Sequence, residues 1–345
     1  MKYLKKIDRF RHKRKIQRLI KLRKKSAIKI KRELRKLIKT VKYKVPEIVN
    51  VKIPKVLYLA QKSTHSSLYG VINSIQAALE LGSRVRLNFD DTDTLHPCGT
   101  LMFLAYIERL LDKYPGMITS NYPKNEVVEQ LFQSVKLLEK LGNTPRRKIT
   151  AENVRYWDYV TGVCTDLTEM VNLFKKYESE INADIRSGLF DSVSEAICNT
   201  INHAYPEHIL NDPMSEKKWW MFAQQRNNNL EIVVYDIGVG IPGSLRSKPE
   251  VKEWLISMIG KHRKKDSYLL SVAIESPRTV TRLPYRGKGL PEMLQFAQGR
   301  GVGGFIIYSQ LGRYGYDASK KLHVKIDLMS PVKGTLLRWS IPLDV

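Results

Sequence analysis

The 345-residue sequence contains few cysteines and no long apolar run. Cys98, Cys164 and Cys198 form no C-x-x-C pair, which argues against a disulfide framework or a cysteine-based zinc site and favours a reducing compartment. No segment approaches the roughly 20 consecutive apolar residues that cross a bilayer, and residues 1–44 lack the apolar stretch of a secretory signal. We therefore expect a cytoplasmic protein with no transmembrane segment.

Common nucleotide and metal motifs are missing as well. The P-loop pattern G-x-x-x-x-G-K-[ST] does not occur, which argues against a Walker-type site. The seven histidines include no H-E-x-x-H pattern, so we expect no structural metal.

Positive charge is concentrated in a basic arm, residues 1–45. Residues 1–44 contain 21 Lys and Arg against Asp8 and Glu33, a net charge of +19 out of the total of +25. Apolar residues recur near helical spacing, which predicts one or two amphipathic helices. Clustered basic side chains neutralise phosphates, so a nucleic-acid backbone is our first candidate partner of residues 1–44. An anionic membrane surface, an acidic protein and a merely solvated tail are the alternatives.

Two α/β domains are expected after the arm, over residues 50–145 and 150–345, joined by a linker at 143–148. Strands and helices alternate in the first domain, which predicts a partly parallel sheet. Its expected strands cover 56–60, 85–89 and 117–120, and its expected helices cover 66–81, 99–114 and 124–141. In the second domain, helices are expected over 166–183, 187–204 and 292–298, and strands over 219–225, 230–235, 304–309, 323–328 and 336–341.

Three short patterns in the second domain carry the chemistry. In the first, Glu195, Asn199 and His203 are successive i, i+4 neighbours on a predicted helix whose opposite side is apolar. An amide oxygen is a hard ligand for Mg²⁺, and a carboxylate can take a proton from an attacking water or hydroxyl. This stripe therefore suits a magnesium–phosphate site.

The other two patterns place glycines beside polar groups. Asp236 ends an apolar strand and opens D-I-G-V-G-I-P, where it can accept a hydrogen bond from an amine such as that of adenine. Gly238 and Gly240 let the backbone come close to a base or a phosphate. The pattern R-G-K-G-L-P leads into a helix whose first N–H groups favour phosphate, and Lys288 adds a mobile positive charge. A K-G-T pattern ending at Thr335 opens the last predicted strand.

In this order, the patterns resemble the N, G1 and G2 boxes of the GHKL (Bergerat-fold) superfamily, which includes gyrase-type ATPases, Hsp90, MutL and histidine kinases. The stretch SEAICNTINHAY is most similar to the anti-sigma-factor serine kinases. The resemblance covers roughly residues 165–345 and implies an α/β sandwich with a mixed sheet that binds Mg-ATP. It makes Glu195 the general base, Asn199 the Mg²⁺ ligand and Asp236 the adenine reader. The nucleotide-binding set that it implies is Asn199, Asp236, Gly238, Gly240, Ile241, Gly287, Lys288, Gly289, Leu290 and Thr335.

Residues 50–145 resemble, less closely, STAS-like domains, the fold of anti-anti-sigma factors. The resemblance lies in the strand R-V-R-L-N-F and in the helix that opens at Gly99. A phosphorylatable Ser typically precedes this Gly in that family, whereas Cys98 does so here. We therefore expect this domain to dock against the ATP-binding domain or a protein partner without being phosphorylated, and Cys98 to be inert rather than reactive.

The sequence thus predicts a cytoplasmic Mg-ATP-binding regulator. Water as the nucleophile would make it an ATPase, and a protein hydroxyl would make it a serine/threonine kinase. The alternatives are a non-catalytic ATP-sensing scaffold, whose arm binds an acidic partner or a membrane surface, and a nucleic-acid-binding protein with a degenerate ATP fold. The 45 or so residues between Pro242 and Gly287 are expected to form a lid. Superfamily members often dimerise, so a homodimer is one candidate state.

Overall fold

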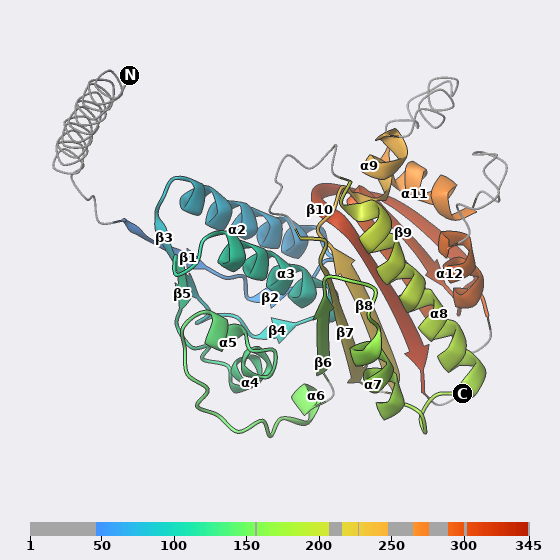
Figure 1. Cartoon of the computed structure of the whole chain (residues 1–345), viewed down its shortest axis with the longest axis horizontal. Helices are drawn as coiled ribbons and strands as arrows, with labels where there is room; N and C mark the ends of the chain where they lie inside the picture. The colour runs from blue at the N-terminus through green and yellow to red at the C-terminus, as the bar shows by residue number, and fades with distance from the viewer. Residues whose placement is uncertain are drawn as a thin grey trace, which may run out of the picture. The chain divides into compact units, whose positions relative to one another are not determined.

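The computed structural model describes residues 46–155, 157–206, 216–226, 228–247, 265–275, 289–299 and 302–343 (Figure 1). Nearly all of them belong to one compact unit, Ile48–Val345. The basic arm, Gly287, Lys288 and much of the expected lid lie outside the described residues.

The first part of this unit is built on parallel strand pairs. Its elements are β1 (Ile48–Lys52), β2 (Val56–Leu57), α2 (Lys62–Glu80), β3 (Arg84–Asn88), β4 (Thr94–Leu95), α3 (Pro97–Lys113), β5 (Ile118–Ser120), α4 (Glu126–Ser134) and α5 (Leu137–Lys140). β3 pairs in parallel with β1 and β5, and α2 and α3 make the crossovers that parallel strands need. β2 and β4 form a second, two-stranded parallel sheet.

The second part is built on one larger sheet. Its strands are β6 (Trp157–Gly162), β7 (Trp219–Arg226), β8 (Asn229–Asp236), β9 (Gly304–Asp317) and β10 (Leu322–Pro342), in the order β6-β7-β8-β10-β9. Its helices are α6 (Glu152–Arg155), α7 (Thr168–Lys176), α8 (Ala183–Asn199), the π-helix η1 (Thr200–Ala204), α9 (Gly240–Ser247), α11 (Asp266–Glu275) and α12 (Gly289–Ala297).

The pairing confirms an α/β protein with both parallel and antiparallel sheets, but the larger sheet differs from the expected mixed one. All four neighbouring pairs among its described strands are antiparallel. β7 and β8 are consecutive strands joined by a short turn, as are β9 and β10, which makes each pair antiparallel. β8 and β9 run in the same direction, but β10 lies between them, so no parallel ladder forms.

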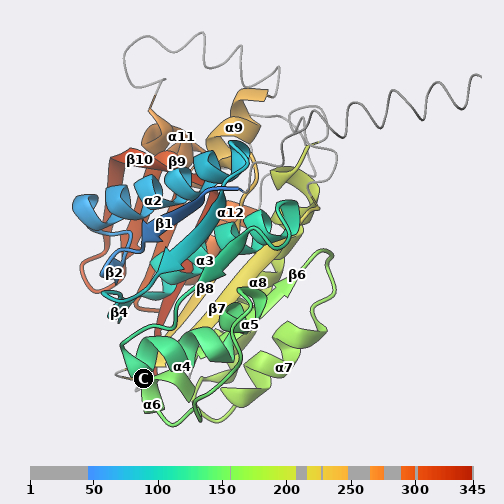
Figure 2. The ribbon, with the colours of Figure 1, turned by 90° about the vertical axis from the view of Figure 1, so that its left-hand side faces the viewer.

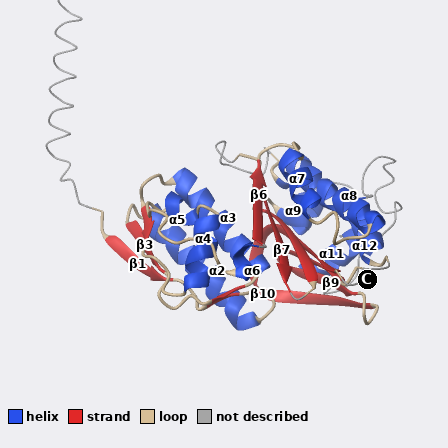
Figure 3. Ribbon diagram, turned by 90° about the horizontal axis from the view of Figure 1, so that it is seen from below, coloured by secondary structure: helices blue, strands red, loops and turns tan. Residues whose placement is uncertain are grey.

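Both faces of the larger sheet are buried, which explains the nearly continuous apolar run of β7. Trp220 and Phe222 pack into a core shared with α2 and α3, whereas Trp219 and Met221 pack into a core shared with α7, α8, α11 and α12. Figure 2 shows α2 lying across β10, and Figure 3 shows the larger sheet between the two groups of helices. Residues 48–141 therefore cover the face of the sheet that α8 leaves open.

Several elements differ from the sequence expectation. The expected strand at 56–60 is reduced to β2, and the expected helix at 166–183 to α7. The expected helix at 124–141 is divided into α4 and α5, because Lys136 adopts a left-handed φ of 58°. β1 and β6 were not expected.

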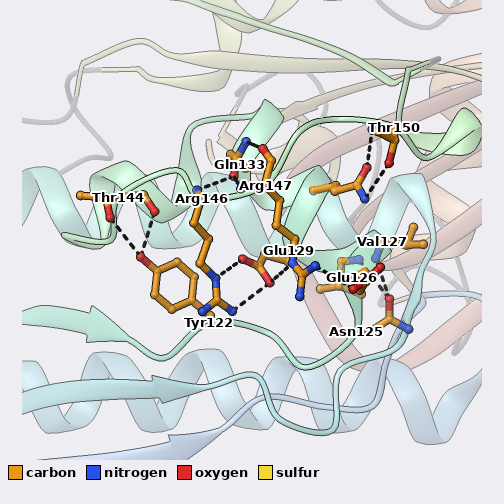
Figure 4. A network of polar contacts seen from close by, with 12 residues as sticks. Tyr122, Asn125, Glu126, Val127, Glu129, Gln133, Thr144, Arg146, Arg147 and Thr150 are labelled. Carbon is orange, nitrogen blue, oxygen red and sulfur yellow. Dashed lines mark hydrogen bonds and ion pairs between the residues drawn. The ribbon is translucent and has the colours of Figure 1, made fainter.

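The 143–148 segment contains no helix or strand, as expected of a linker, but it is fixed to α4 (Figure 4). Glu129 is fully buried, and its Oε1 accepts a hydrogen bond from Arg146 Nε at 2.6 Å. Arg147 Nε donates to the other oxygen of the same carboxylate at 2.8 Å, and Gln133 accepts from both arginine backbone N–H groups. The hydrogen bonds from Arg146 hold the pKa of Glu129 below its ordinary value despite burial.

Candidate functional site

Helix α8 positions the first predicted pair. Asn182 caps the helix by accepting a hydrogen bond from Asp184 N at 2.9 Å. Leu189, Val193 and Ile197 are fully buried against the sheet, so Glu195 and Asn199 lie on the partly exposed side. Asn199 Nδ2 donates to Glu195 Oε1 at 3.0 Å. The predicted carboxylate–amide pair is therefore formed.

Glu195 also meets the backbone at the start of α12. A Cβ placed on Gly289 would lie 2.0 Å from Glu195 Oε1, so position 289 has no room for a side chain unless the carboxylate moves. Burial raises the pKa of Glu195, the Asn199 hydrogen bond opposes this, and the Glu292 carboxylate adds to it. A carboxylate with a raised pKa is suited to accept a proton near neutral pH.

Asp236 lies at the end of β8, only 5% exposed, directly across from Thr335 of β10. Burial raises the pKa of its carboxyl group to about 7, against the effect of hydrogen bonds from the backbone N–H groups of Gly238 and Thr335 and from the Thr200 hydroxyl. The Gly238 N–H donates to Oδ1 at 2.8 Å. No cation is among the causes of the shift, so the described structure contains a buried acid without a charged partner.

Three backbone segments meet around this carboxyl group, and glycine is needed where they do. A Cβ on Gly238 would lie 2.2 Å from the carbonyl oxygen of Ala204, at the end of η1. Gly334 has a φ of 83°, and a Cβ there would lie 1.9 Å from the carbonyl oxygen of Asp236. Neither position tolerates a side chain without a backbone shift. The 236–240 loop is thus held between η1 and β10.

Three further polar side chains of this site were missed from the sequence. Ser309 Oγ accepts from Ile241 N at 2.9 Å and donates to the carbonyl oxygen of Gly334 at 2.7 Å. Gln310 Nε2 donates to the carbonyl oxygen of Val239 at 2.9 Å. Tyr205 OH accepts from Ile237 N at 3.0 Å. Tyr205 could have been considered because it ends the stretch SEAICNTINHAY, whereas no sequence signal marks Ser309 or Gln310.

The structure therefore brings the predicted residues into two neighbouring groups. Asp236, Gly238, Gly240, Ile241 and Thr335 lie around the end of β8; Glu195, Asn199 and Gly289 lie between α8 and α12. The α8–η1 segment joins the groups, because Thr200 lies beside the Asp236 carboxyl group and Ala204 contacts Gly238. Leu290, the second residue of α12, is half-buried and packs against the hydrophobic core. His203 lies in the π-helix η1, after the helix has changed from α to π at Thr200.

The segment that runs from the end of β8 into α9 also contains the pattern G-x-G-x-x-G, at Gly238, Gly240 and Gly243. This pattern marks a dinucleotide site only within a parallel βαβ unit. β8 pairs antiparallel with both of its neighbours, so a Rossmann site does not fit.

The residues present fit a magnesium ion that is held mainly by a phosphate ligand. Asn199 donates through Nδ2 to Glu195, which leaves its Oδ1 available as a hard oxygen ligand. The described residues contain no group of three or more His, Cys, Asp and Glu that could hold a metal. Phosphate oxygens and water would have to supply the remaining ligands, as is usual for Mg²⁺ at nucleotide sites.

Cys98 and a cleft in the first part of the unit lie apart from this site. Burial raises the pKa of the Cys98 thiol to about 12, so the thiol is protonated and unreactive near neutral pH. The cleft, about 830 Å³, is lined by ion pairs that include Lys55–Asp93 at 3.3 Å and Lys124–Asp90 at 3.6 Å. These charges compensate one another.

No family model matches the sequence, and no curated protein is significantly similar to it. In the part of the chain that the structure describes, no helix is long and apolar enough to cross a membrane.

Proposed function

We propose that this protein is a Mg-ATP-binding regulatory protein that acts as an ATPase or a serine/threonine kinase of the GHKL type. The observation that carries the proposal is the meeting of patterns that are far apart in sequence. Asp236 lies across from Thr335, and Glu195 lies against Gly289. The GHKL resemblance assigns Asp236 and Thr335 to the adenine, and Glu195 and Gly289 to the phosphate end, so each contact supports the proposal.

The group around Asp236 suits the adenine. A buried carboxyl group with no charged partner is costly unless a ligand uses it. The exocyclic amine of adenine can donate a hydrogen bond to the Asp236 carboxyl group.

The group around Glu195 suits the phosphates. Asn199 would hold Mg²⁺, which when bound neutralises charge that develops on the phosphates. The first N–H groups of α12, from Gly289 onward, favour a negative ligand. Glu195 would take the proton from the attacking water or hydroxyl, for which its raised pKa is suited. Lys288 is proposed to reach the terminal phosphate.

The proposal also covers the partners, the oligomeric state and the cellular compartment of the protein. We propose that residues 1–44 contact a nucleic-acid backbone in the cytoplasm, that a protein partner binds within residues 50–145, and that the protein works as a monomer or homodimer. The three cysteines are free in the structure, which suits a reducing compartment. The second candidate function is a non-catalytic ATP-sensing scaffold.

The test is γ-labelled ATP with Mg²⁺ and the full chain, with and without nucleic acid. Glu195→Gln removes the proposed base, and Glu169→Gln, an exposed carboxylate on α7, is the matched control. General-base catalysis contributes about 10²–10⁴-fold, so turnover should fall by that factor only in Glu195→Gln. Label released as phosphate indicates an ATPase, and label retained on protein indicates a kinase. Saturable binding without turnover supports the scaffold, and no nucleotide binding contradicts the proposal.

A further inference from the structure

Helix α3 is attached to the larger sheet through a buried carboxylate. Glu108 Oε2 accepts hydrogen bonds from Trp220 Nε1 of β7 at 2.8 Å and from Lys218 Nζ at 3.1 Å. Its Oε1 accepts from Tyr159 OH of β6 at 2.7 Å and from Lys140. Burial alone would raise the pKa of Glu108, but these donors outweigh it and lower the pKa. The carboxylate is therefore charged and fully compensated, which fixes α3 against β6 and β7.

The next residue of α3, Arg109, reaches toward the candidate nucleotide site. Its Nη2 donates to the carbonyl oxygen of Glu216 at 2.5 Å. Its guanidinium lies 5.5 Å from the centre of the Tyr205 ring and 5.6 Å from that of Trp220, within the range of cation–π attraction. Arg109 thus holds both the chain entering β7 and the ring of Tyr205.

Tyr205 in turn holds the loop that carries Asp236. Its hydroxyl donates to the carbonyl oxygen of Lys218 at 2.7 Å and accepts from the N–H of Ile237 at 3.0 Å. Ile237 directly follows Asp236, and Tyr205 itself is buried. A continuous set of contacts therefore runs from Arg109 through Tyr205 to the residue beside the proposed adenine reader.

We propose that Arg109 and Tyr205 are positioning residues through which helix α3 sets the geometry of the 236–240 loop, and with it the affinity for nucleotide. Without the Tyr205 hydroxyl, the Ile237 N–H and the Lys218 carbonyl each lose a hydrogen-bond partner in a partly buried region. Without Arg109, the Tyr205 ring loses the cation that holds it. A ligand or partner that shifts α3 would shift the loop by the same contacts, so the part of the unit that contains residues 48–141 would regulate the site. The link to affinity rests on the proposed function, whereas the positioning of the loop does not.

The test measures amide hydrogen exchange of Ile237 in the full chain, together with ATP affinity. Tyr205→Phe removes the acceptor for this amide and should speed its exchange by about tenfold. Arg109→Gln does not touch the amide, yet it should speed the same exchange, and Arg109→Lys, which retains a donor for the Glu216 carbonyl, should restore most of the protection. Tyr122→Phe removes a hydroxyl that bonds to Thr144 instead and is the matched control.

The two readouts separate the outcomes. Faster exchange at Ile237 in both variants, with the β7–β8 amides unchanged and ATP affinity weakened, supports the proposal. Unchanged exchange at Ile237 in Arg109→Gln overturns it, as does a general rise over the whole sheet, which would indicate a purely structural role. If the wild-type protein binds no ATP, the proposed function fails, while the exchange data still decide whether Arg109 positions the loop.

Discussion

Asp236→Asn should stabilise the nucleotide-free protein while destroying its nucleotide site. Burial raises the pKa of Asp236 to about 7, against an ordinary value of about 3.9. Each tenfold change in proton affinity is worth about 1.4 kcal/mol, so ionising this group in the folded state costs about 4 kcal/mol. An amide avoids this cost, and its oxygen can still accept from Gly238 N.

The sign of the pH dependence follows from proton binding. Between about pH 4 and pH 7 the folded protein holds a proton on Asp236 that the unfolded chain has lost, so wild-type stability from this group falls as pH rises. The asparagine variant lacks this dependence. Its advantage in unfolding free energy should grow from near zero at pH 4 to as much as about 4 kcal/mol above pH 7.

Urea denaturation of both proteins over this pH range measures the difference directly, because all other titrating groups cancel. A difference that does not change with pH, or a wild type that is more stable than the variant at pH 8, would refute the assignment of Asp236 as a buried, unpaired acid. The same variant is the control that separates loss of binding from loss of folding.

Four further predictions concern other positions in the chain. Gly289→Ala should push the Glu195 carboxylate aside and lower turnover by at least about tenfold. The melting temperature should change little, because the added methyl group meets a flexible side chain. A large fall in melting temperature together with the loss of turnover would instead show a folding defect. Glu129→Gln should cost about 1.5–3 kcal/mol in urea unfolding, because the neutral amide weakens the charge-assisted hydrogen bonds from Arg146 and Arg147, whose side chains are partly exposed; a loss below about 1 kcal/mol would mean that these bonds add little to stability. Burial, with a smaller effect of Arg338, lowers the pKa of His96 to about 4, so the contribution of His96 to the unfolding free energy should fall by up to about 3 kcal/mol as pH drops from 6.5 to 4, opposite in sign to that of Asp236. The difference in unfolding free energy between wild type and His96→Gln should change by this amount over that range, and a difference independent of pH contradicts the assignment. Binding of nucleic acid by residues 1–44 should weaken steeply with salt, as a filter-binding series would show, and salt-independent binding would exclude backbone contact.

The elements that could be predicted from the sequence are those with a strong period and a clear stop. α2 ends two residues before Gly82, whose φ is 79°, and α3 begins at Pro97, so both helices lie close to their expected positions. β1 was missed because only Val51 is buried among its mostly exposed residues. The break between α4 and α5 falls at Lys136, a residue type that gives no sign of a left-handed conformation.

The candidate site also could be predicted only where a local pattern marks it. The patterns of glycine and acidic residues predicted where backbone segments come close together and where the carboxylates lie, because both features depend on residue type. Thr335 was expected to open a strand, but it lies within β10, where the register shifts next to Gly334. Ser309 reaches the site only through β9–β10 pairing, and Arg109 only because α3 packs on β7. Long-range pairing of this kind leaves no local pattern in a single sequence.

The most direct test of the nucleotide site is a calorimetric titration of the whole 345-residue chain with ATP and Mg²⁺, beside Asp236→Asn. The wild type should bind ATP saturably, and the variant, which should remain folded and be more stable above pH 7, should bind it at least about a hundredfold more weakly. Equal affinity for the two proteins, or no binding to the wild type, would contradict the assignment of this site to a nucleotide.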